Sequence, residues 1–296
     1  MEERKNNLVF FAMGEMYNKQ CLYAILSLLN VYERKIPNSI HIYVYTNLPK
    51  LYDVLEHEIP LDLICIDENT MQRWRMGKSY FFTTKISLIR EFLMNYPGNM
   101  VFVDTDVIFK KKLNAVFDKV SRGEYILHLK ESQLSLPENT HFMESFQDKK
   151  FTLQSGRIIH VNGSSEMWNS GLIGISSSDV DLVEDVLELC GKLEPHSTSR
   201  VLEQLAFSLI FKNTGRLVGE RSLLVHYWWK KSLFNPIINE ALEDTKVDLD
   251  KLLNKVATLD PTNRTMALRF FYSLHPNGLL RKSIVKTSLI LGIPIK

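Results

Sequence analysis

The sequence predicts an α/β protein in which a mostly parallel β-sheet is flanked by helices. Two observations lead to this expectation. Short apolar segments alternate with helix-like segments through the first hundred residues, which is the pattern of βαβ units. The last of these apolar segments ends on a pair of acidic residues, at the kind of position where α/β sheets bind their ligands. The expected fold is therefore a nucleotide-binding one.

Four strands and three helices are expected in the N-terminal part. The strands are compact or alternating runs of apolar and β-branched residues, and the helices repeat apolar residues at intervals of three and four. Leu22, Ile25 and Leu29, for example, share one helical face. In chain order, the expected elements are strand 8–13, helix 18–32, strand 40–45, short helix 51–57, strand 61–66, helix 84–96 and strand 100–103.

The C-terminal part shows weaker patterns. Residues 132–139 and 147–154 are polar and loop-like, strands are expected at 158–161, 172–175 and 223–228, and helices at 179–189 and 201–212. Beyond about residue 234 the chain is expected to be helical. We therefore predict a main domain over residues 1–235 and a C-terminal helical extension over 236–296.

The end of the extension allows two interpretations. Basic residues alternate with apolar ones over 279–296. Such a segment can form a helix that packs on the domain, which is the common case, or a basic amphipathic helix in peripheral contact with an anionic membrane.

Composition narrows the functional classes. Of 296 residues, 45% are hydrophobic and 24% are charged, as in ordinary globular domains, and a net charge of +2 argues against a nucleic-acid partner. The three cysteines form no CxxC pair, which argues against a structural zinc site. The apolar run at 8–13 is too short for a signal peptide, and no run approaches the ~20 apolar residues that span a bilayer. A cytoplasmic location is expected.

The segment 101–107 carries the clearest chemical signal. An apolar run is followed by Asp104 and Asp106, whose side chains point the same way on an extended chain. Two neighbouring carboxylates repel each other unless a cation lies near them. Oxygen ligands of this kind suit Mg²⁺ or Mn²⁺, which also bind phosphate oxygens. An Asp-x-Asp pattern also occurs in ordinary surface turns, but the apolar strand before it favours a metal site.

His226 is the expected third ligand. It follows the apolar run 223–225 and precedes the aromatic and basic residues 227–231. A histidine after a strand is more often structural, but a neutral imidazole is also a common metal ligand. The nearby Lys230 could neutralise a phosphate as a point charge. We expect Asp104, Asp106 and His226 to hold the metal.

Six short motifs follow one another between about residues 8 and 232. They are Gly14-Glu15-Met16-Tyr17, Phe82-Thr83-Thr84-Lys85-Ile86, Asp104-Thr105-Asp106, Trp168-Asn169-Ser170-Gly171-Leu172, Glu203-Gln204 and His226-Tyr227-Trp228-Trp229-Lys230. In this order they resemble the motifs of glycosyltransferase family 8, the group of glycogenin and bacterial galactosyltransferases. The resemblance implies the GT-A fold and transfer of a sugar from a nucleotide-sugar. The chain departs from the family where Glu203 replaces an aspartate and where the closing motif lacks its Gly and its Lys-Pro-Trp.

The resemblance implies roles on the nucleotide side of the site. Tyr17 would stack on uracil, while Glu15 would accept hydrogen bonds from the base or ribose. Lys85 would contact a donor phosphate or a sugar hydroxyl. Thr105, inside the acidic motif, would also belong to the donor site, and Lys230 would help to neutralise the diphosphate.

On the sugar side, the resemblance implies that Asn169 and Ser170 bond sugar hydroxyls and that Gly171 allows a close approach. Gln204 would lie near the anomeric carbon, where it would position groups and stabilise charge. Gln204 and Asp106 are the expected catalytic residues, and the resemblance implies retention of configuration.

The predicted function is therefore metal-dependent transfer of a hexose, glucose or galactose, from a UDP-sugar to a carbohydrate or lipid-linked acceptor. Two alternatives stay open. A haloacid-dehalogenase-type phosphatase also carries a strand followed by Asp-x-Asp, with the first Asp as nucleophile. A non-catalytic module that binds a sugar nucleotide could share the fold without turnover.

Overall fold

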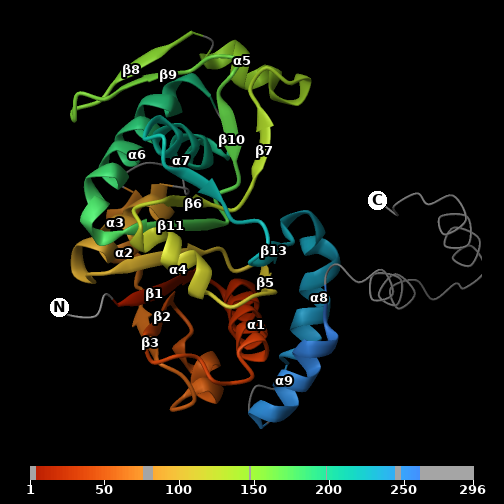
Figure 1. The fold of residues 1–296 in the computed structure, drawn as a ribbon. Coiled ribbons are helices and arrows are strands. Elements are labelled where there is room, and N and C mark those ends of the chain that lie inside the picture. Colours follow the sequence, from red (N-terminus) through yellow and green to blue (C-terminus); the bar gives the residue numbers. More distant parts are fainter. Residues whose placement is uncertain (1–4, 76–82, 147, 198, 244–247, 261–296) are drawn as a thin grey trace, which may run out of the picture.

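The computed structural model describes residues 5–75, 83–146, 148–197, 199–243 and 248–260, and its centre is a seven-stranded mixed sheet (Figure 1). The strand order is β12-β6-β11-β4-β1-β2-β3. Strand β11 runs antiparallel to both of its neighbours, whereas the other pairs are parallel. The strands are β1 (Asn6–Ala12), β2 (Ile40–Thr46), β3 (Leu61–Cys65), β4 (Asn99–Val103), β6 (Tyr125–Leu127), β11 (Leu172–Ser176) and β12 (Leu217–Gly219).

Helices cover both faces of this sheet, because alternate residues of its strands are apolar on opposite sides. In β4, Val101 and Val103 enter one core cluster and Met100 and Phe102 enter the other. The first cluster includes residues of α1 (Glu15–Val31) and α4 (Asn114–Ser121). The second includes residues of α2 (Glu68–Arg75), α3 (Thr83–Asn95), α6 (Val180–Leu193) and α7 (Leu202–Asn213). The predicted α/β class with a mostly parallel, helix-flanked sheet is confirmed.

Three two-stranded sheets lie outside the main one (Figure 1). Strand β5 (Val107–Phe109) pairs with β13 (Leu224–His226), and β7 (Lys130–Gln133) pairs with β10 (Glu166–Trp168). Strands β8 (Lys150–Thr152) and β9 (Ile158–His160) form the third and flank the short helix α5 (Thr140–Phe146). The first two of these sheets carry side chains of the site described below.

The N-terminal expectations hold to within a few residues, with one change of type. The segment expected as a helix at 51–57 is a 3₁₀ helix, η1 (Pro49–Leu55). The sequence did not predict α2, in which only Met71 and Trp74 are buried. It also did not predict α4 and α5 or the short strands β5, β6, β7, β8, β10 and β12.

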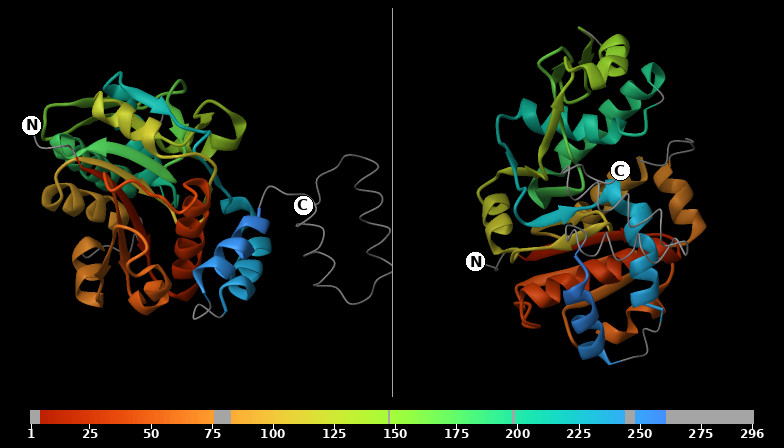
Figure 2. Two further views of the ribbon diagram at one scale, coloured as in Figure 1. Left: turned by 60° about the horizontal axis from the view of Figure 1, so that its bottom comes forward. Right: turned by 90° about the vertical axis from the view of Figure 1, so that its right-hand side faces the viewer.

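Two helices follow the site at the C-terminal end, α8 (Lys231–Ala241) and α9 (Leu249–Thr258), and they lie beside α1 (Figures 1 and 2). Phe234, Ile238, Leu252 and Val256 are buried in the core cluster of α1. The domain boundary at residue 235 stays a prediction, and the segment 279–296 lies outside the described residues. Within the described part of the chain, no helix has both the length and the apolar character needed to cross a membrane.

Candidate metal centre and pocket

The acidic pair lies where the central strand β4 ends. All five residues of β4 are buried, and the backbone N–H of Asp104 donates to the carbonyl oxygen of Gly171, just before the neighbouring strand β11, at 3.0 Å. This bond holds the acidic segment against β11. The side chain of Asp104 is 30% exposed and that of Asp106 only 4%. Asp104 is therefore the more accessible carboxylate of the pair.

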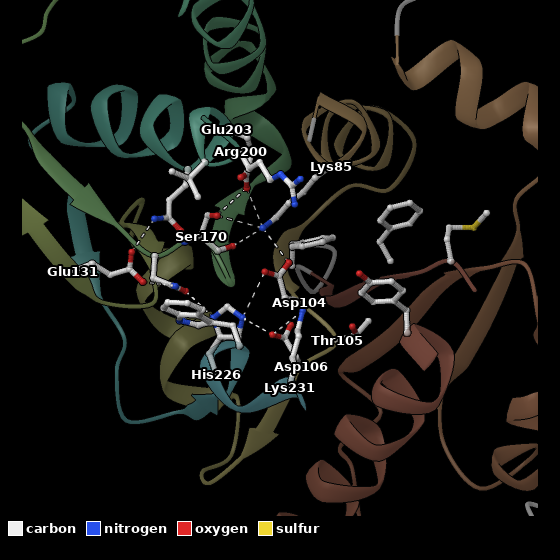
Figure 3. Close-up of a pocket in the computed structure, with 18 residues that line it drawn as sticks. Lys85, Asp104, Thr105, Asp106, Glu131, Ser170, Arg200, Glu203, His226 and Lys231 are labelled. Carbon is white, nitrogen blue, oxygen red and sulfur yellow. Dashed lines mark hydrogen bonds and ion pairs between the residues drawn. The ribbon is translucent and has the colours of Figure 1, made fainter. Parts of the chain in front are cut away.

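His226 reaches the acidic pair through the β5–β13 pairing, in which it lies opposite Val107. Its Nε2 lies 3.2 Å from Oδ2 of Asp106 and 3.9 Å from Oδ2 of Asp104 (Figure 3). One ligand atom from each of the three side chains lies within 4.8 Å of the others. The pairing of two short strands thus joins groups that are far apart in the sequence.

Asn169 orients the imidazole. Its Oδ1 accepts a hydrogen bond from the backbone N–H of Gly171 at 2.9 Å and lies 2.9 Å from Nδ1 of His226. Its Nδ2 donates to Oε1 of Glu131 at 2.7 Å, which fixes the orientation of the amide. An oxygen facing Nδ1 favours the tautomer with the proton on Nδ1, so the lone pair of Nε2 points at the carboxylates. This is the orientation that a metal-binding histidine needs.

Gly171 lies directly behind the imidazole. A Cβ atom at this position would lie 2.3 Å from Nδ1 and 2.5 Å from Cε1 of His226. Any side chain here would therefore displace the ring. In the structure the group that approaches Gly171 is His226, and the predicted close approach of a sugar stays a prediction.

The three side chains fit a divalent cation. Oδ2 of Asp106 is buried and makes no well-aligned hydrogen bond, although Nε2 of His226 and Nζ of Lys231 lie within ion-pair distance. A buried carboxylate oxygen without a hydrogen bond is costly unless a ligand satisfies it. Two carboxylates and an imidazole form a donor set typical of Mg²⁺ or Mn²⁺.

Two lysines neutralise the carboxylates. Nζ of Lys85 lies 3.0 Å from Oδ1 of Asp104 and 3.1 Å from Oε1 of Glu203, and Nζ of Lys231 lies 3.1 Å from Oδ2 of Asp106 (Figure 3). Burial lowers the pKa of Lys85, but the two carboxylates outweigh this effect and raise its pKa. Both lysines are therefore positive charges at the place where an anionic ligand would meet the metal.

The pKa of Asp106 responds to the same groups. Burial raises it, but the close contact with His226 and the ammonium of Lys231 outweigh burial and hold the pKa at about 2. Asp106 is therefore ionised at neutral pH, as a metal ligand must be.

A second polar network lies beside the metal centre. Oε1 of Gln204 accepts from the backbone N–H of Ser170 at 3.2 Å, and its Nε2 donates to Oε2 of Glu131 at 2.9 Å. The hydroxyl of Ser170 donates to Oε1 of Glu203 at 2.8 Å. Both ends of the Gln204 amide are engaged, so its orientation is determined before a ligand arrives.

These groups line one pocket of about 390 Å³ (Figure 3). That size suits a small organic ligand. The sequence-predicted residues among its lining are Tyr17, Lys85, Asp104, Thr105, Asp106, Asn169, Ser170, Gln204 and His226.

Three predicted residues lie elsewhere. Gly171 packs behind His226, as described above. Glu15 is not part of the lining, and its carboxylate accepts from Nζ of Lys19 at 2.7 Å on the outer side of α1. Lys230 is also not part of the lining, because helix α8 begins one residue later and presents Lys231 to the pocket instead.

The lining residues that sequence reasoning did not assign to the site include Glu131, Arg200, Trp228 and Lys231. Glu131 lies in a short polar strand whose pattern matches a surface loop, and Arg200 lies just before α7. Trp228 lies in the motif that begins at His226 and Lys231 directly follows that motif, so the departure of this segment from the family pattern was the available signal.

Solved structures share this fold. The apo form of mouse xyloside xylosyltransferase 1 aligns with a TM-score of 0.51 at 14% sequence identity, over 79% of this chain and 92% of that one. The galactosyltransferase LgtC, in complex with donor and acceptor sugar analogues, aligns with a TM-score of 0.51 at 10% identity, over 88% and 99% of the two chains. The sequence matches no protein-family model and no curated protein. These likenesses confirm the GT-A-type fold.

Proposed function

We propose that this chain is a metal-dependent glycosyltransferase that moves a hexose, glucose or galactose, from a UDP-sugar to a carbohydrate or lipid-linked acceptor. One observation carries the proposal: Asp104, Asp106 and His226 converge at the carboxyl end of β4, inside a pocket of a GT-A-type fold. In α/β sheets, this is the edge at which ligands bind.

The donor would lie across the metal centre. Asp104, Asp106 and His226 would hold Mn²⁺ or Mg²⁺, which when bound supplies positive charge for the diphosphate leaving group. Lys85 and Lys231 would add two ammonium groups on the same side. Tyr17, half-exposed at the start of α1, offers its ring to the base.

The sugar would lie over the second network. Asn169 and Ser170 line this part of the pocket, and Gln204 is held between Ser170 and Glu131. A neutral amide is a poor nucleophile, so we assign Gln204 to positioning and to stabilising charge at the anomeric carbon. Glu131 would keep the amide in place, because its partners among the described residues are the amides of Asn169 and Gln204. Retention of configuration is part of the proposal through the family resemblance.

The phosphatase alternative receives less support. It requires Asp104 as a free nucleophile, whereas this carboxylate is paired with Lys85 and faces Nε2 of His226. The folds that align with the chain are those of sugar transferases. A non-catalytic module would have the same binding site, so only a measurement of turnover distinguishes it from an enzyme.

Isothermal titration calorimetry tests the donor site. The protein is titrated with UDP and with GDP, each in Mn²⁺ and in EDTA. We expect UDP binding that EDTA abolishes, followed by release of UDP from a UDP-hexose when acceptors are supplied. No metal-dependent binding of either nucleotide would refute the proposal, and binding without any hydrolysis or transfer would favour the non-catalytic module.

A further inference from the structure

Two exposed tryptophans follow the histidine of the metal centre. Trp228 and Trp229 begin the 3₁₀ helix η5 (Trp228–Lys230) and are 54% and 55% exposed. Their rings meet edge to face, with centroids 6.1 Å apart. Two adjacent, half-exposed indoles leave a large apolar surface in water, which is a mark of a binding surface.

Only one of the two faces the pocket. Trp228 is part of the pocket lining, whereas Trp229 is not. Trp228 follows the ligand His226 by two residues, and Lys231 in the next turn pairs with Asp106. The indole of Trp228 is therefore fixed beside the centre where a sugar would be transferred.

The polar groups of the same pocket suit hydroxyls. Glu131, Asn169 and Gln204 present a carboxylate and two amides, which together can accept and donate hydrogen bonds. The face of an indole is electron-rich, and the axial C–H bonds of a pyranose carry partial positive charge, so the two stack. An aromatic face beside carboxylate and amide groups is thus suited to a sugar ring, while a lipid chain would need an aliphatic groove.

The donor has other partners in the pocket. The lysines at Asp104 and Asp106 mark the place for a diphosphate, and Tyr17 lies in the first turn of α1 with Nζ of Lys231 5.6 Å from its ring centroid. Tyr17 therefore suits the base of the nucleotide. Tyr17 and Trp228 are the exposed aromatic side chains of this lining, and of the two Trp228 is the one to which the donor gives no role.

We propose that Trp228 is the platform on which a pyranose ring of a carbohydrate acceptor stacks. The inference rests on the proposed function and names its acceptor class as a saccharide. Trp229 meets this ring edge to face but lies outside the pocket lining and does not touch the acceptor.

Tryptophan emission provides a first test, and calorimetry measures disaccharide binding to each variant, because a substitution at Trp228 removes the emitting side chain. The full-length protein with Mn²⁺ and UDP is titrated with lactose, maltose, cellobiose and chitobiose. At least one disaccharide is expected to change the emission saturably, and Trp228→Ala is expected to weaken its binding about tenfold or more. Trp228→Phe, which keeps a ring, should recover part of the loss. Trp229→Ala is the matched control, with equal exposure outside the pocket, and should bind within about twofold of the unsubstituted protein.

Three results would overturn the inference: no disaccharide binds, Trp229→Ala loses as much affinity as Trp228→Ala, or Trp228→Ala instead weakens UDP binding measured by calorimetry. The last result would assign the ring to the nucleotide. A failure of the proposed function would give a different pattern of results. In that case UDP does not bind any version of the protein, while a disaccharide still binds in a manner that depends on Trp228.

Discussion

Gly171→Ala tests how the metal-ligand histidine is held. The added Cβ would lie 2.3 Å from Nδ1 of His226, whereas ordinary contacts of a Cβ begin at 3.4 Å. The imidazole must therefore retreat by about 1 Å, the difference between these distances. The hydrogen bond between Nδ1 and Asn169 would be lost in the same movement, because the Cβ also comes within 2.9 Å of Oδ1.

The expected effect is larger on metal binding than on folding. Disturbing the groups that orient a metal-binding histidine costs about 10- to 100-fold in metal affinity. One extra methyl group in a packed interior costs about 1–3 kcal/mol of stability, which a domain of this size can lose without unfolding. Mn²⁺ titration in the absence of nucleotide measures the first effect, and thermal unfolding measures the second.

Gly174→Ala is the matched control for this substitution. It lies three residues further along, inside β11, and its Cβ would lie 2.8 Å from Cβ and Cγ1 of Ile126, away from the metal centre. It should lower the melting temperature and leave Mn²⁺ affinity unchanged. Unchanged Mn²⁺ affinity in Gly171→Ala, or an equal loss in Gly174→Ala, would refute the assigned role of the glycine.

Three further predictions concern charged side chains. Asp106→Asn should keep the fold, as judged by circular dichroism, but abolish metal-dependent UDP binding; UDP binding retained with Mn²⁺ as the only metal would contradict the ligand assignment. Lys231→Met should bind Mn²⁺ alone more tightly, because no ammonium then competes for Asp106. The same variant should bind UDP in the presence of Mn²⁺ more weakly. Calorimetry of both titrations checks that the two affinities change in opposite directions. Glu166 is stabilised as the anion: burial raises its pKa, but hydrogen bonds from Lys130 and Lys212 outweigh this and lower the pKa to about 2. Its contribution, about 1 kcal/mol after solvent screening, is present above pH 4.5 and lost as the pH falls towards 2. Thermal melts of Glu166→Gln should therefore differ from the unsubstituted protein at pH 7 and converge near pH 2.

The N-terminal half could be predicted because its strands are long apolar runs. Strand β4 is five consecutive buried residues and ends on Asp104, so both the strand and its ligand are visible in one short segment. Strands β6 and β12 have three residues each, which is too short for any periodicity. They exist because of hydrogen bonds to strands that are distant in the sequence, and no local pattern records those.

The residues of the candidate site also divide into those that the sequence reveals and those that only the folded chain reveals. His226 was found because an apolar run precedes it, as one precedes Asp104. Glu131 was missed because its short strand is polar and only the folded chain brings it to Gln204. Lys230 and Lys231 are adjacent and chemically identical, so the sequence does not show which of them faces the site. The start of α8 directs Lys231 toward Asp106.

The two-stranded sheet of β5 and β13 also implies an order for folding and metal binding during synthesis. Asp106 and His226 are about 120 residues apart, and the strand that carries His226 is among the later elements to leave the ribosome. A nascent chain that ends before His226 carries two carboxylates but no imidazole, so it lacks the complete ligand set. Metal capture by the complete ligand set would then follow the docking of β13 onto β5, and the bound ion would close a loop of about 120 residues, about half of the predicted domain. Chains truncated before this strand would lack the complete metal site.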